Sequence, residues 1–276
     1  MGHARATGCF TAQDLRNRSF KHQKLEGADF SGSDLRGCDF AGAYLTNANF
    51  ERAKMGQSWR QRVSWMTIAI VTFLIVGHGV SNLVFGSLGQ TPTDKAWNYV
   101  MVLVGASGLA GIGGLGRWLK QPLKQWTEVL AGGATGAVTG FFYAGTFTGK
   151  NPQWAIAGAV LSGVCLGGLR IRWQGPTTEI MLQLAIALTT YGFTFLVGAT
   201  ALAMLNVGDR ISGAGLGTLG LLYLYLTWQE LITAVQTCRH APGTSFRKAH
   251  LTNAKFSPEA RRQADFSGAI GQHFAD

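Results

Sequence analysis

Ionisable side chains inside apolar segments are the first candidates for chemistry in this 276-residue chain, because such residues are costly to bury and commonly functional. His78 stands near Asn82 in one apolar stretch. It could ligate a haem or another pigment, or relay a proton, but the pattern favours a hydrogen-bonded interior histidine. Glu230 stands beside Gln229 in another apolar stretch. It could bind a cation, although an ion pair with Arg239 at the membrane interface is the favoured interpretation.

The remaining polar motifs have structural interpretations. Glu128 and Glu179 stand at the beginning of apolar stretches, where a carboxylate suits a helix N-terminus. A cation transporter would need several buried carboxylates on converging spans, and the sequence does not indicate them. The glycine cluster at 105–116 contains a GxGxxG-like spacing, but it lies within an apolar stretch without a preceding strand, so it predicts no phosphate loop.

The four cysteines are Cys9, Cys38, Cys165 and Cys238. They are far apart and form no CxxC pair, so they indicate neither a metal site nor a disulfide framework. We interpret them as isolated small hydrophobic residues. No Ser/His/Asp set or carboxylate pair stands out, and we predict a non-enzymatic protein with no catalytic residue, metal or cofactor.

The composition indicates the membrane as the setting for these residues. The chain is 47% hydrophobic and only 14% charged, whereas soluble domains carry about 25% charged residues. Six apolar stretches approach or exceed the roughly 20 residues that cross a bilayer. We expect spans at about 65–86, 97–116, 128–148, 153–170, 178–206 and 212–236. Four or five crossings are the alternative, if a short segment enters the membrane without crossing it, and six is favoured.

The distribution of Lys and Arg predicts the orientation of these spans. With six spans and a cytoplasmic N-terminus, twelve basic residues flank the cytoplasmic side, namely Arg52, Lys54, Arg60, Arg62, Arg117, Lys120, Lys124, Arg170, Arg172, Arg239, Arg247 and Lys248. Only Lys95, Lys150 and Arg210 fall on the opposite side. This asymmetry follows the positive-inside rule and predicts that both termini are cytoplasmic. The net charge of +10 is then an orientation signal that also attracts membrane lipid, rather than a sign of a nucleic-acid partner.

Small residues recur at every fourth position in two of the expected spans. Gly132, Gly136 and Gly140 share one helix face, and Ala155, Ala159, Gly163 and Gly167 share another. Such faces allow helix backbones to approach closely. We interpret them as packing contacts within a compact bundle or a homo-oligomer, with a narrow pore or hinge as the alternative.

A repeat of five residues precedes the apolar stretches. A large apolar residue stands at every fifth position from Phe10 to Met55, and from Ala28 onward a small residue stands two positions earlier. A period of five fits neither a strand nor an α-helix. A second block with the same period follows the apolar stretches. The expected core residues of the two blocks are Phe30, Leu35, Phe40, Leu45, Phe50, Met55, Phe246, Leu251, Phe256 and Phe266. The slot at Arg261 is broken although the count is kept.

The stretches GADFS, GSDLR, GCDFA, GAYLT and NANFE resemble the pentapeptide repeat family, specifically over 26–55 and more loosely over 8–25. The resemblance implies a right-handed quadrilateral β-helix with four repeats per coil. Phe and Leu alternate, and Phe246 is the type that should follow Met55, so we expect the second block to dock on the first. The predicted fold is a six-helix transmembrane bundle (61–238) plus one short β-helix formed by segments 1–60 and 239–276 together.

Multi-pass proteins with such repeats resemble a group common in cyanobacteria. The resemblance implies a membrane scaffold, assembly factor or accessory subunit in the plasma or thylakoid membrane, presenting its β-helix to a protein partner that could belong to a photosynthetic complex. The alternatives are a small channel or transporter with the repeats as a regulatory domain, and a pigment- or lipid-binding subunit that uses His78.

Overall fold

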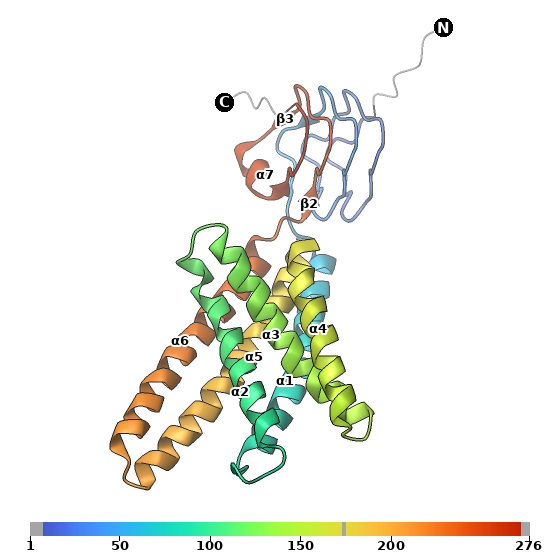
Figure 1. Cartoon of the computed structure of the whole chain (residues 1–276). Helices are drawn as coiled ribbons and strands as arrows, with labels where there is room; N and C mark the ends of the chain where they lie inside the picture. Colours follow the sequence, from blue (N-terminus) through green and yellow to red (C-terminus); the bar gives the residue numbers. More distant parts are fainter. Residues whose placement is uncertain (1–7, 173–174, 272–276) are drawn as a thin grey trace. The chain divides into compact units, whose positions relative to one another are not determined.

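A computed structural model describes residues 8–172 and 175–271 of the chain. The chain divides into two compact units (Figure 1). The repeat unit comprises Met1–Met66 and Arg239–Asp276, and the helical unit comprises Thr67–Cys238. Residues 1–7 and 272–276 of the two predicted terminal segments lie outside the described residues.

The repeat unit is a stack of coils in which parallel bridges join residues 20 positions apart, such as Asp14 to Asp34 and Lys24 to Tyr44. Four repeats of five residues therefore make one coil. Most repeats turn on a residue with positive φ, found two positions after the central apolar residue, as at Asn17 (61°) and Gly27 (69°). Glycine, and less readily asparagine, adopts this conformation without much strain, which explains why these two types are frequent there, although Ala12, His22, Arg52 and Lys248 also adopt it.

The segment after the helical unit continues the same stack, as the red and blue coils lying side by side in Figure 1 illustrate. Ser245 bridges to Asp39, and His250 bridges to Tyr44. The short strands β1 (Asn49–Phe50) and β3 (Lys255–Phe256) pair in parallel, as do β2 (Thr244–Ser245) and β4 (Ala264–Asp265). The Phe40 amide donates to the carbonyl of Ser245 at 2.7 Å. The backbone ladder thus runs from one segment into the other.

Two columns of phenylalanine rings fill the repeat unit. Phe10, Phe30, Phe50 and Phe256 stack face to face with centroids 4.8–5.1 Å apart, and Phe20, Phe40, Phe246 and Phe266 stack at 4.9–5.3 Å. The columns meet edge to face, with 5.3 Å between the centroids of Phe50 and Phe246. Each such ring pair adds about 0.5–1.5 kcal/mol to the effect of burial.

All ten core residues named from the sequence belong to this cluster, with Phe266 half-buried at its end. The broken repeat at Arg261 forms a short helix, α7 (Pro258–Arg262), whose Ala260 is buried in the same cluster. The small residues two positions before the core residues, from Ala28 to Ala53, are also buried. The two blocks therefore share one core.

Within the described residues, the helical unit is built from six helices and a 3₁₀ segment. These elements are α1 (Trp59–Ser87), α2 (Trp97–Ala110), η1 (Gly111–Arg117), α3 (Leu123–Phe147), α4 (Pro152–Arg172), α5 (Pro176–Asn206) and α6 (Arg210–His240). The first turns of α1 belong to the repeat unit, so the chain passes from one unit to the other within this helix. Pro152 and Pro176 begin their helices, where a missing amide hydrogen costs nothing. Helix α1 begins six residues before the expected span at 65–86, and α3 begins five before the one at 128–148.

Within the residues that the structure describes, five helical segments are long and apolar enough to cross a membrane. They are Trp59–Ser87, Trp97–Gly116, Pro152–Leu169, Pro176–Asn206 and Arg210–His240. Helix α3 is not among them, and its sequence is rich in glycine and threonine, which are less apolar than the residues of the other helices. The chain is therefore mostly helical with five candidate spans, and the count of six stays a prediction.

Helices α3 and α4 approach each other through glycine. A Cβ atom on Gly136 would overlap the carbonyl oxygen of Ser162, and one on Gly140 would overlap that of Gly158. On α4, a Cβ on Gly163 would lie 3.0 Å from the carbonyl oxygen of Gly133. The two backbones are thus in direct contact, which side chains larger than hydrogen would prevent.

The other small residues named from the sequence lie along the same helices. A Cβ on Gly167 would lie 3.1 Å from the Val129 carbonyl oxygen, and one on Gly132 would lie 3.1 Å from Leu182 Cδ1. Ala155 is buried, whereas Ala159 is half-buried. The four-residue spacing did not single out Gly158 and Ser162, which belong to the α4 side of this contact.

Because the two blocks of the repeat unit share one core, a substitution in the second block should also destabilise the first block. We expect Phe246→Ala to destabilise the repeat unit by about 3–5 kcal/mol, because it leaves a cavity against Phe40 and Phe50. Amide hydrogen exchange should then accelerate over residues 28–50 as well as around residue 246. Ile270→Ala, at a side chain that is 55% exposed, is the control and should change little. Unchanged protection over 28–50 would contradict a shared core.

The glycine contact between α3 and α4 gives a matched pair of substitutions. Gly136→Ala should lower the melting temperature in detergent, because the added methyl forces the backbones apart at a cost of about 1–3 kcal/mol. Gly168→Ala, on α4 where a Cβ meets nothing within 4 Å, should leave it unchanged or raise it, since alanine favours a helix by about 1 kcal/mol. Intrinsic tryptophan fluorescence can follow both, and equal shifts would refute the contact.

Candidate functional site

The outer surface of the repeat unit carries a cluster of alternating charges on one face, formed by Asp14, Arg16, Asp34 and Arg36. Arg16 donates to Asp14 through Nε at 2.9 Å and Nη2 at 2.6 Å, and Arg36 binds Asp34 in the same two-pronged way. Arg16 Nε also lies 3.9 Å from Asp34 Oδ2, which links the two coils. This charged cluster is neutral as a whole.

The arginines lower the pKa of both carboxyl groups. The pKa of Asp14 falls from 3.8 to about 2, chiefly because its carboxylate accepts hydrogen bonds from the Arg16 side chain. The pKa of Asp34 is lowered for the same reason by Arg36. Both groups stay ionised at physiological pH, so the cluster is a fixed feature of the surface.

A second face of the repeat unit is less charged and more aromatic. Lys24, Tyr44, His250 and Ile270 follow one another from coil to coil along parallel bridges. The rings of Tyr44 and His250 stack with centroids 4.6 Å apart. The side chains of Tyr44 and Ile270 are 41% and 55% exposed. We refer to these four residues as the Tyr44 column.

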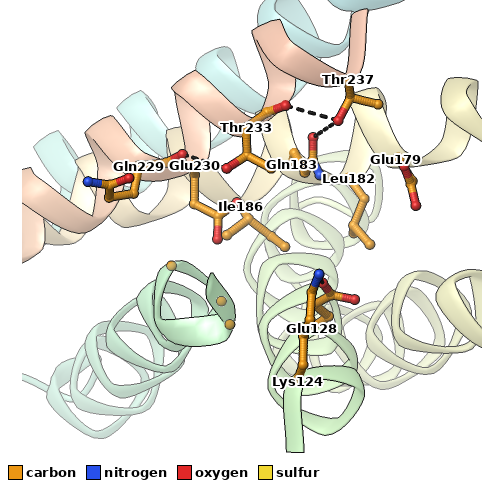
Figure 2. A pocket seen from close by; sticks show the side chains of 13 residues that line it. Lys124, Glu128, Glu179, Leu182, Gln183, Ile186, Gln229, Glu230, Thr233 and Thr237 are labelled. Atoms are coloured by element: carbon orange, nitrogen blue, oxygen red, sulfur yellow. Dashed lines mark hydrogen bonds and ion pairs between the residues drawn. The ribbon is translucent and has the colours of Figure 1, made fainter. Parts of the chain in front are cut away.

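The helical unit contains a polar pocket of about 210 Å³. It is lined by glycines of η1 and by polar and apolar side chains of α3, α5 and α6 (Figure 2). The lining residues are Gly113, Gly114, Gly116, Lys124, Glu128, Glu179, Leu182, Gln183, Ile186, Gln229, Glu230, Thr233 and Thr237. Three carboxylates from three helices therefore line one cavity.

Glu230 is the most deeply buried of these carboxylates, with only 7% of the residue exposed. Its side chain points from α6 toward η1 and α3 (Figure 2). A Cβ built on Gly113 would lie 3.0 Å from Glu230 Oε1 and 3.0 Å from Ala131 Cβ. Among the residues that the structure describes, none donates a hydrogen bond to the Glu230 carboxylate or forms an ion pair with it.

The glycine cluster at 105–116 gains a structural role here. In η1, a Cβ on Gly114 would lie 3.2 Å from the Leu226 carbonyl oxygen, and one on Gly111 would lie 2.5 Å from Tyr223 Cε1. Helix α6 can therefore pack close to η1 only because these positions lack side chains. The interpretation that the cluster is not a phosphate loop stays a prediction.

Hydroxyl and amide groups line the wall of the pocket on α5 and α6. Thr237 Oγ1 lies 3.2 Å from Gln183 Oε1 and 2.9 Å from the Thr233 carbonyl oxygen. Thr233 donates to the Gln229 carbonyl at 2.8 Å. Near Glu128, Lys124 Nζ lies 3.9 Å from Oε1. The lining thus supplies many oxygen atoms and the single ammonium group of Lys124.

The pocket changes two interpretations made from the sequence. Glu230 was expected to pair with Arg239, but its carboxylate points into the pocket (Figure 2). Glu128 was expected at the start of a helix and instead lies in the second turn of α3, whereas Glu179 does lie in the first turn of α5. The sequence did not predict that the three carboxylates line one pocket, because this depends on how distant helices pack.

His78, the candidate for cofactor binding, lies on the surface of the helical unit. The prediction of an interior histidine is wrong, because the side chain is exposed. Its Nδ1 lies 3.3 Å from Tyr143 Oη, which donates to the Ile75 carbonyl at 2.8 Å. The predicted hydrogen bond is present.

The four cysteines are free thiols. Burial raises the pKa of Cys38 to about 11, which makes this thiol unreactive. Over residues 8–172 and 175–271, no three His, Cys, Asp or Glu side chains are placed to hold a metal ion.

Comparison with known proteins identifies the repeat. A family model for pentapeptide repeats matches residues 19–58 with eight copies. The match covers most of the first block of repeats and does not include the second block. No curated protein and no solved structure gives a significant match to the chain.

The charged cluster predicts a dependence of stability on pH. Because the pKa of Asp34 is lower in the folded protein, its stabilising effect is complete above its ordinary value of 3.8 and is lost as the pH falls below it. Asp34→Asn should therefore cost about 0.5–1 kcal/mol at neutral pH, and this difference should vanish in acid. Melting temperatures measured from neutral pH down to about pH 2 test this. Glu26→Gln, at an exposed carboxylate, is the control, and a constant difference would contradict the assignment.

Proposed function

We propose that this chain is a non-enzymatic integral membrane scaffold, assembly factor or accessory subunit that presents a pentapeptide-repeat β-helix to a protein partner. Pentapeptide repeats suggest a protein-interaction module, and the five apolar helices are consistent with a membrane protein. The observation that carries the proposal is that one repeat unit is built from both ends of the chain.

The repeat unit has the features expected of a right-handed quadrilateral β-helix. Its bridges are parallel and, within each block, join residues 20 positions apart, and its core residues follow one another at every fifth position within a block. The C-terminal segment adds bridges at Ser245, His250 and Ile270 to the same faces. These contacts support one composite β-helix of segments 1–60 and 239–276.

The joint between the two segments supports an even number of spans. Gln57 Nε2 donates to the Ala241 carbonyl at 2.8 Å, and Gln61 Nε2 donates to the Gly243 carbonyl at 2.9 Å. The chain leaves and re-enters one folded unit at these points, so both connections lie on the same side of a membrane. Five segments are apolar enough to span, and we propose α3 as the sixth span, with Lys124 and Glu128 near its first turns.

The basic residues support an assignment of the two sides. The excess of twelve Lys and Arg over three supports a cytoplasmic location for the repeat unit and both termini. On the repeat unit, Arg16, Arg18 and Arg60 line a groove of about 440 Å³ beside Trp59, which is 74% exposed. Exposed tryptophan and arginine suit anionic lipid headgroups at a membrane surface. The membrane is the plasma or, by analogy with cyanobacterial proteins, the thylakoid membrane.

The Tyr44 column is the surface that we propose contacts the partner. Tyrosine is enriched among the residues that dominate binding energy, and an apolar side chain such as Ile270 contributes burial. A β-helix holds these side chains in fixed positions, so little entropy is lost on binding. The charged cluster is already satisfied by internal ion pairs and offers less to a partner.

The polar pocket favours an alternative, in which the chain is a small channel or transporter and the repeats are its regulatory domain. A third possibility is a pigment- or lipid-binding subunit that uses His78, whose exposed ring would face lipid or a pigment.

The scaffold makes a specific prediction for the Tyr44 column. Purification from native membranes in mild detergent should yield a stoichiometric protein partner with the wild type. Tyr44→Glu should lose that partner, since it places a charge in the contact, whereas Glu51→Lys on another part of the surface should keep it. Mass spectrometry of the purified complexes provides the measurement. A lone oligomer that passes ions in liposomes would overturn the scaffold in favour of the channel.

A further inference from the structure

Glu230 is a buried carboxylate whose charge is not balanced by any neighbour among the described residues. It lies on α6, 7% exposed, and points into the polar pocket. An ionised carboxylate in a water-poor interior is unfavourable unless it is neutralised, and such residues in membrane helices mark ion or proton pathways. Something other than the described protein groups must therefore compensate Glu230 when it is ionised.

The lining of the polar pocket matches a cation. Gln183, Thr233 and Thr237 contribute amide and hydroxyl oxygens, in addition to the carboxylates of Glu128 and Glu179. The ammonium group of Lys124 is placed beside Glu128, 3.9 Å from Oε1, and so offsets that carboxylate. Hard cations prefer such oxygen ligands.

The volume of the polar pocket favours an inorganic ion over an organic ligand. A cavity of about 210 Å³ holds about seven water molecules at ~30 Å³ each. Pockets for organic ligands usually exceed about 300 Å³. A cation that keeps part of its hydration shell fits this space, with waters bridging to the wall.

The number of charged groups in the polar pocket indicates that the bound cation is monovalent. Glu128 faces Lys124, and Glu179 lies half-buried at the start of α5 with its side chain directed away from Glu230 in Figure 2. One buried carboxylate remains, and one positive charge neutralises it. Gly113 leaves the space beside Glu230 Oε1 that a side chain would fill.

We propose that the polar pocket binds a small monovalent cation, with Glu230 as its charged ligand and the oxygens of Gln183, Thr233 and Thr237, directly or through water, as the remainder of the site. This binding goes beyond the scaffold function and does not depend on the Tyr44 column.

The test is the thermal stability of the full-length protein in mild detergent at neutral pH. N-methylglucamine chloride is replaced stepwise by NaCl, KCl or LiCl at constant ionic strength. We expect a saturable rise in melting temperature with at least one of these ions, because a ligand that binds only the folded state stabilises it. Glu230→Gln keeps the shape but removes the charge and should abolish the rise. Asp209→Asn, at a loop carboxylate outside the pocket, is the control and should retain it.

Two further variants keep the test decisive if Glu230→Gln fails to fold. Thr237→Val removes one oxygen at almost constant volume and should shift the midpoint of the salt titration to higher concentration. Gly113→Ala places a methyl 3.0 Å from Glu230 Oε1 and should shift it in the same direction. The proposal would be overturned if the melting temperature of the wild type did not change with the cation concentration, or changed only with the pH. An undiminished response in Glu230→Gln would do the same.

Discussion

The repeat unit depends on the stacking of side chains from one coil to the next. Within a coil, five-residue repeats bring only a few central side chains together, so a coil has no closed core and must lie on a neighbour. The second block supplies that neighbour. Phe246 stacks on Phe40 at 4.9 Å, and Phe256 stacks on Phe50 at 4.8 Å. The chain must therefore return to its first block after residue 238, and this requirement restricts the topology of everything between.

The helical unit also depends on close contacts, which form between helix backbones at glycines that lack side chains. At Gly136 and Gly140 the backbones of α3 and α4 touch, and at Gly113 and Gly114 segment η1 meets α6. Contacts of this kind are stabilised by van der Waals packing. Within a lipid bilayer the hydrophobic effect does not drive helices together, because the lipid tails are as apolar as the side chains. The close approach of η1 to α6 also encloses Glu230, so the polar pocket is a consequence of the glycine cluster.

Regular periods made much of the repeat unit predictable from the sequence. The five-residue spacing located the core, and the alternation of Phe and Leu indicated which residues share a column. The sequence contains a further signal, because a Gly or Asn stands two positions after many of the central residues and marks a positive-φ turn, as at Asn17 and Gly27. The polar pocket could not be predicted in this way, because Glu128 and Glu230 lie on helices a hundred residues apart. The exposure of His78 likewise depends on the rotation of α1 in its bundle, which a nearly uniform apolar stretch does not specify.

The split of the repeat unit has a consequence for when its surface exists. Tyr44 is followed along its face by His250 and Ile270, and these residues are separated from it by the whole helical unit. The complete column forms only after helix α6 has been made and the segment that follows it has reached the first block. The stacking energy of the aromatic columns is released in the same step. The energy gained by completing the core therefore favours the arrangement of helices that brings the two segments together over those that leave them apart.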